Sequence, residues 1–154
     1  MGAWHGTIIL LPINTGIDIY PLAQVITCSF KGGNSVQHIN VMQVAQEWEQ
    51  YANIHFDFVS TGNPIVRIDF IATQGSWSYV GKEVLRIAAD KATMNLGWIG
   101  AKSSLITAEE RGVILHEFGH TLGLLHEHQH PEREGTITLR EKRECFLSHC
   151  CLCA

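Results

Sequence analysis

The sequence predicts an α+β fold with a small twisted mixed sheet, an amphipathic helix and a second, long helix. Three observations indicate this class. Short runs of alternating apolar residues, typical of strands, lie between Val25 and Ile99. One helical pattern interrupts these runs, and a second follows them. The 154 residues, 45% hydrophobic and 17% charged, suit one ordinary folded domain.

The first elements can be placed in order along the chain. Val25–Phe30 alternates and is rich in β-branched residues, which predicts a strand closed by the turn at residues 31–34. Apolar residues recur at helical spacing from Ser35 to Ala52, which predicts the amphipathic helix. A loop is predicted at Gly75–Gly81. Further strands are predicted at Ile54–Val59, Ile65–Ile71 and Ala92–Ile99.

The long helix has clear start and stop signals. Thr107 and Glu110 have the spacing of a capping box, in which each side chain bonds the other residue's backbone N–H. Glu109 and Glu110 also suit the positive end of the helix dipole. Gly123 is a natural stop, because glycine readily adopts the left-handed conformation that ends helices. The sequence therefore predicts a helix from Ala108 to Leu122.

Composition argues against several classes of partner. The net charge is −4, and Lys and Arg form no patch along most of the chain, which argues against nucleic acid. No apolar run approaches the roughly 20 residues of a membrane span. No secretory signal is predicted, because the apolar run Ile8–Pro12 is short and the first basic residue is Lys31. The localisation is left open by these patterns.

The cysteines do not define a disulfide framework. Cys28 stands alone, and four more lie close together near the C-terminus. Their odd total prevents disulfides from using all five, and the spacing of the last four does not match a zinc ribbon. Those four thiols have three interpretations: no designed role, a disulfide or oligomer contact, or metal binding. They are Cys145, Cys150, Cys151 and Cys153.

The stretch GVILHEFGHTLGLLHEHQHPE, residues 112–132, carries the chemistry. His116 and His120 are four residues apart on the predicted helix, so their Cβ atoms lie about 5–6 Å apart on one face. Two imidazoles so placed can bind one zinc ion. Glu117, next to the first histidine, can reach a zinc-bound water without ligating the metal. This is the HExxH arrangement.

The motif continues to a third histidine. Gly123 allows the chain to turn sharply after the helix and bring His126 back to the same metal. Three histidines leave a fourth position for water, which is typical of a catalytic zinc site. The alternative, two buried histidines satisfied by hydrogen bonds, leaves the glutamate, the glycine and the third histidine unexplained. Glu127, His128 and His130 are interpreted as a polar turn.

The motif HEFGHTLGLLHEH resembles that of metzincin metallopeptidases, most closely the microbial astacin-like branch. The upstream segments AQEWEQYANIHFDFV, SWSYVG and ATMNLGW are similar to the same family, and the resemblance covers about Val25 to Glu134. It implies three parts. Residues 25–134 are a zincin-like metallopeptidase domain, namely its N-terminal subdomain with the active-site helix. Residues 1–24 are an atypical N-terminal segment, and residues 135–154 an atypical Cys-rich tail.

The resemblance also implies an activity and a site. His116, His120 and His126 would bind one catalytic zinc ion, and Glu117 would be the general base of a zinc-dependent metalloendopeptidase that uses a zinc-activated water. A peptide or protein substrate in extended conformation would pair with the strand around Ala92–Trp98. Relatives of this family are often secreted.

The sequence departs from the family after the third histidine. Metzincins have a methionine turn downstream of it, and astacins a tyrosine near the zinc, whereas every methionine and tyrosine here precedes His116. A truncated enzyme with its C-terminal subdomain largely missing is therefore expected. One alternative is a non-catalytic zinc-binding remnant, acting as a pseudoprotease or interaction module. Another is a closed site in which Cys150 or a neighbour is a fourth zinc ligand.

Overall fold

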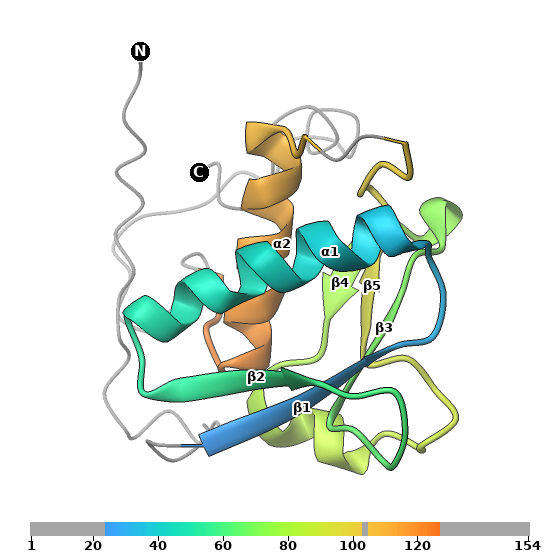
Figure 1. The fold of residues 1–154 in the computed structure, drawn as a ribbon. Coiled ribbons are helices and arrows are strands. Elements are labelled where there is room, and N and C mark those ends of the chain that lie inside the picture. Colours follow the sequence, from blue (N-terminus) through green and yellow to red (C-terminus); the bar gives the residue numbers. More distant parts are fainter. Residues whose placement is uncertain (1–23, 103–104, 127–154) are drawn as a thin grey trace, which may run out of the picture.

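A five-stranded mixed sheet with two α-helices on one side forms the described part of the chain, residues 24–102 and 105–126 of the computed structural model (Figure 1). The strand order is β2-β1-β3-β5-β4, and only β4 is antiparallel to its neighbour. The strands are β1 (Gln24–Phe30), β2 (Ile54–Phe58), β3 (Val66–Asp69), β4 (Ser76–Ser78) and β5 (Met94–Leu96). The predicted α+β class is confirmed. The predicted tail 135–154, and residues 1–23 of the predicted N-terminal segment, lie outside the described residues.

The first helix is shorter than the sequence predicts. The α-helix α1 spans Ser35–Ala45, and a 3₁₀ turn, η1, continues it over Gln46–Gln50. The predicted continuation to Ala52 was therefore wrong. Tighter 3₁₀ turns are common at helix ends. Here the change is accompanied by tertiary bonds, because Trp48 donates to the second helix and Glu49 accepts from β2.

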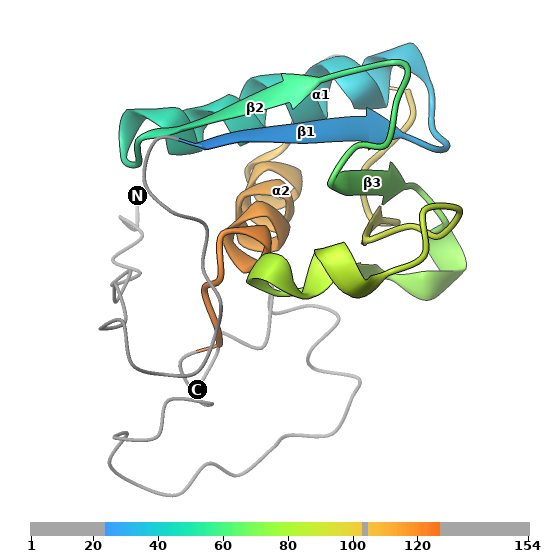
Figure 2. The same cartoon turned by 90° about the horizontal axis from the view of Figure 1, so that it is seen from below.

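The second helix, α2, spans Ala108–Thr121 and confirms the predicted boundaries closely. Thr107 caps it, and the capping box with Glu110 is present, with bonds of 3.1 Å and 3.0 Å. The helix α1 has a capping box as well, between Asn34 and Gln37. Both helices lie on the same side of the sheet, and α1 runs over β1 and β2 (Figure 1, Figure 2).

The edge of the sheet differs from the prediction. Residues 76–78 were expected in a loop, but they form β4, the edge strand. The strand β5, expected to pair with substrate, lies between β3 and β4 and has no free edge, so that prediction was wrong. The side-chain amide of Asn95 on β5 explains the difference. It accepts from Ile71 N–H and donates to the carbonyls of Ile71 and Gly75, which fixes the turn before β4.

The core lies between the sheet and the two helices. Phe56 and Phe118 meet edge to face within it, with ring centroids 4.9 Å apart. Aliphatic side chains from the sheet and from both helices fill the rest, and they include Ile26, Val41, Val66, Ile68, Leu96 and Ile114. Two 3₁₀ turns, η2 (Ala72–Gln74) and η3 (Gly81–Arg86), lie in the connections. None of the helices in the described residues has the length and apolar character needed to cross a membrane.

Candidate metal centre

Three imidazoles converge at the C-terminal end of α2. Nε2 of His126 lies 3.1 Å from Nε2 of His116 and 3.1 Å from Nε2 of His120. The three ring nitrogens all lie within 4.8 Å of one another. The histidines that the sequence selected are therefore brought together, two from the helix and one from the segment beyond it.

A glycine turn returns the chain to the helix. Gly123 has a φ of 98°, in the left-handed region, as its predicted role as a helix stop requires. Its N–H bonds the carbonyl of His120 at 2.8 Å, and Leu124 N–H bonds that of Gly119 at 3.0 Å. This pair of bonds is the Schellman motif. It reverses the chain within one turn, so that His126 faces the residues that precede it.

A backbone carbonyl fixes the orientation of the His120 ring. Its Nδ1 lies 2.7 Å from the carbonyl oxygen of Leu124. Since a carbonyl only accepts, Nδ1 carries the proton and Nε2 keeps its lone pair. A ring nitrogen held in this way is the usual arrangement for a metal-binding histidine.

The donor set fits a zinc ion. Zinc binds histidine nitrogen at about 2.0–2.1 Å, which places two nitrogens on one ion roughly 3–3.5 Å apart. The observed 3.1 Å separations lie in that range. Burial and the neighbouring imidazoles lower the pKa of His116 to about 4, and burial lowers the pKa of His120. Both rings are thus neutral near pH 7, which ligation requires, and the three histidines could hold one zinc ion.

Glu117 lies on the same turn of α2 and is only 5% exposed. Its Oε2 has no hydrogen-bond partner within the described residues. Burial raises the pKa of Glu117 to about 8. A buried carboxyl oxygen without a protein partner is costly, and such groups are retained chiefly where a ligand, ion or reaction uses them.

Comparison with known proteins identifies the family. The profile of the astacin peptidase family matches residues 20–144. The chain belongs to the astacin family. The chain of a solved structure of myroilysin is 42% identical, with a TM-score of 0.69, over 75% of this chain and 55% of that one. Zinc metalloproteinase nas-30 of Caenorhabditis elegans is 26% identical over 124 residues, which are 80% of this chain and 15% of nas-30.

A shorter stretch of the chain shows a higher identity to a toxin. Astacin-like metalloprotease toxin 2 of Loxosceles intermedia is 60% identical over 30 residues, 20% of this chain and 12% of the toxin. The chain thus spans a small part of the curated astacins it matches and about half of myroilysin. Astacins are zinc-dependent, and both the predicted family and the zincin-like fold are confirmed.

The sequence left two structural features of this astacin's site unpredicted. One is the edge strand β4 beside α2, and the other is the packing of Trp48 against α2. The short length of β4 concealed the first, and the helical spacing of Trp48, typical of any core residue, concealed the second. The predictions for Glu127, His128, His130 and the four C-terminal cysteines fall outside the described residues.

Proposed function

We propose that this astacin chain is a zinc-dependent metalloendopeptidase in which His116, His120 and His126 hold the metal and Glu117 is the general base. The observation that carries the proposal is the convergence of three Nε2 atoms beside a buried carboxyl that lacks a protein partner among the described residues. Three protein ligands leave room for water, as in catalytic zinc sites.

The residues divide the chemistry as follows. Bound zinc supplies a Lewis acid that makes water more acidic and polarises the scissile carbonyl. Glu117 accepts a proton from the attacking water as the new C–O bond forms. It then delivers this proton to the amine as the C–N bond breaks. The buried position of Glu117 strengthens its electrostatic effect, because little water screens it.

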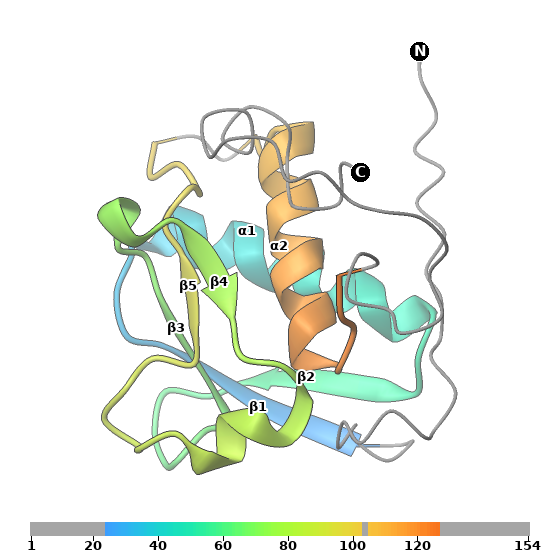
Figure 3. The same cartoon turned by 180° about the vertical axis from the view of Figure 1, so that it is seen from behind.

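The edge strand β4 offers a place for an extended substrate. Tyr79 N–H bonds Thr93 O at 3.0 Å and Gly97 N–H bonds Gly75 O at 3.1 Å, so Gly75 and Tyr79 face β5. Since backbone groups alternate along a strand, those of Ser76 and Ser78 point to the outer edge. This edge lies beside α2 (Figure 3). A peptide added there would run close to the proposed metal ligands.

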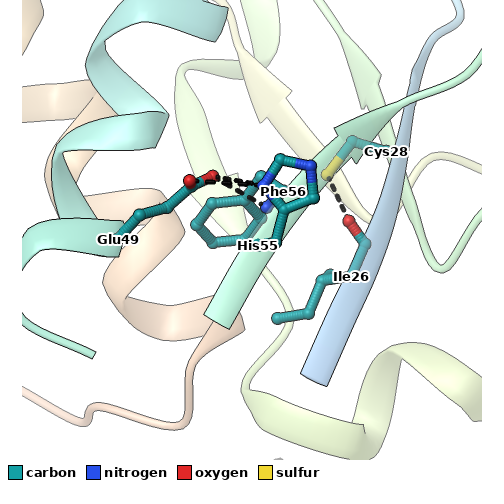
Figure 4. Close-up of polar contacts among 5 residues, drawn as sticks. All are labelled: Ile26, Cys28, Glu49, His55 and Phe56. Carbon is teal, nitrogen blue, oxygen red and sulfur yellow. Dashed lines mark hydrogen bonds and ion pairs between the residues drawn. The ribbon is translucent and has the colours of Figure 1, made fainter. Parts of the chain in front are cut away.

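The opposite edge of the sheet is protected. Phe56 on β2 donates its N–H to Oε1 of Glu49 at 3.0 Å, and not to another strand (Figure 4). The same carboxylate lies 3.2 Å from Nδ1 of His55. A charged side chain over an edge strand blocks pairing with another chain. Of the two edges, β4 is therefore the one suited to a peptide.

A proline at Ser78 tests this substrate edge. Ser78→Pro removes the outward N–H, and edge strands tolerate proline where the N–H is not in the ladder. We expect kcat/KM for peptide cleavage to fall roughly tenfold, the effect of one lost hydrogen bond. Ser78→Ala is the matched control, because it keeps the N–H and loses only the hydroxyl, which donates to the carbonyl of Tyr79 at 3.0 Å and lies 3.2 Å from the hydroxyl of Thr121. Equal activity of the two variants would exclude this edge as the binding strand.

The activity itself is tested with an unstructured protein. The zinc-loaded chain is expected to cleave casein, and a chelator is expected to abolish cleavage until zinc is restored. Mass spectrometry of the products identifies the cleaved bonds. One zinc per chain without any cleavage would contradict the peptidase proposal and favour a non-catalytic zinc-binding module.

A further inference from the structure

We propose that Trp48 is a positioning residue for the zinc site. It bonds Leu115 on α2, although the two residues are 67 positions apart in the sequence. Trp48 belongs to η1, the turn that continues α1. Its Nε1–H donates to the carbonyl of Leu115 at 3.1 Å, one residue before the first proposed zinc ligand. In Figure 3, α1 passes across α2, which brings η1 towards the ligand-bearing end.

Gly119 provides the space that this packing needs. A Cβ atom at Gly119 would lie 3.4 Å from the Trp48 ring and 3.4 Å from Cδ1 of Leu124. Both distances are at the tight limit of ordinary contact. Glycine weakens a helix interior, and Gly119, unlike Gly112 with open space around it, is covered by neighbouring side chains. Trp48 and Leu124 thus both lie over the bare surface of Gly119.

Leu124 connects this packing to the ligands. Its N–H bonds the carbonyl of Gly119 at 3.0 Å, and its own carbonyl lies 2.7 Å from Nδ1 of His120. It also begins the segment that leads to His126. A displacement of Leu124 would therefore change the orientation of one ligand and the return path of another. Trp48 limits that displacement from the side of α1.

A second link between the same two elements separates positioning from simple tethering. Glu47 on η1 bonds Arg111 in the first turn of α2, with Nε of Arg111 2.9 Å from Oε1 of Glu47. Arg111 lies more than one turn before the first proposed ligand, His116, whereas Leu115 is its direct neighbour. If tethering of η1 to α2 were sufficient, the loss of either link would have the same effect on the metal.

The experiment measures zinc affinity of the full chain by competition with a chromophoric chelator, and stability of the zinc-free chain by urea unfolding. Trp48→Phe removes the indole N–H and part of the ring, and Gly119→Ala fills the space. We expect Trp48→Phe to lower zinc affinity about 10–100-fold, the range for residues that support metal ligands. Gly119→Ala should lower it less, because its methyl group only just reaches the Trp48 ring and Leu124. Glu47→Gln is expected to stay within about twofold. If Trp48→Phe does not fold, Gly119→Ala alone tests the proposal, because alanine favours the helix.

The double variant gives the most specific outcome. In Trp48→Phe the smaller ring leaves room for a methyl group, so the added effect of Gly119→Ala should be smaller than in the wild type. Unchanged zinc affinity in both single variants, or an equal loss in Glu47→Gln, would overturn the proposal. The inference rests on the zinc site of the proposed function but not on cleavage. A wild-type chain that binds zinc without cleaving casein would refute the peptidase alone, and one that binds no zinc would overturn both.

Discussion

Replacement of Glu117 by glutamine is expected to lower kcat/KM for peptide cleavage by a factor of about 10²–10⁴, with one zinc ion per chain still bound. Glutamine keeps the size and most of the shape of the side chain, but its amide does not accept a proton at neutral pH. The three imidazoles are unchanged, so metal binding should persist. The measurement is casein cleavage together with zinc analysis of the same sample.

The environment of Glu117 means that glutamine should remove the base without destabilising the zinc-free chain. Burial raises the pKa of the carboxyl to about 8 in the zinc-free chain, so the group is largely neutral there at pH 7. Glutamine then replaces a neutral group of similar shape, and zinc-free stability should not fall. A cation held by the three histidines favours the ionised, basic form. Full activity of Glu117→Gln would exclude this residue as the base, and loss of zinc would assign it a structural role.

The cluster of three histidines was predictable because its signal is local. Two histidines at helical spacing, a capping box before them and a glycine after them define both the helix and its stop. The structure places Thr107 at the cap and Gly123 in the left-handed conformation. The third imidazole follows from the reversal at that glycine. Each step depends on residues close together in the sequence.

The edge strand and the support of the metal site depend on distant residues. Residues 76–78 lie between glycines, so their sequence alone indicates a loop. Asn95 on the neighbouring strand holds the turn that precedes them. Trp48 has the spacing of an ordinary core residue, and its role emerges only from its bond to Leu115 and its packing against Gly119. Local patterns do not contain these pairings.

The proposed site combines residues from two separate elements, the helix α2 and the edge strand β4. The helix α2 carries the proposed base and two of the histidines, while β4 supplies the edge proposed for a peptide. Thr121, next to His120, bonds Ser78 on β4 at 3.2 Å and thereby links the two. This hydroxyl bond adds to the packing of β4 beside α2, which places the proposed substrate edge near the histidines (Figure 3).

Loss of the third histidine should remove the metal from this arrangement. His126→Ala leaves two imidazoles on α2, and the return of the chain at Gly123 then brings no ligand to them. For the wild type, free zinc at 1,000 times its dissociation constant should add about 4 kcal/mol to the free energy of unfolding. In His126→Ala the same zinc concentration should add much less, and the zinc-dependent rise in Tm should largely disappear.

A histidine on the opposite edge of the sheet provides the control. His55 is exposed and contacts Glu49, away from α2, so His55→Ala should keep the full zinc-dependent stabilisation. Zinc-free stability of His126→Ala should stay near that of the wild type, because burial and the neighbouring His120 and His126 lower the pKa of His116, and removal of one close imidazole relieves part of that effect. An equal response of both variants to zinc would mean that the metal binds elsewhere. A loss confined to His126→Ala would show that the glycine turn completes the zinc site.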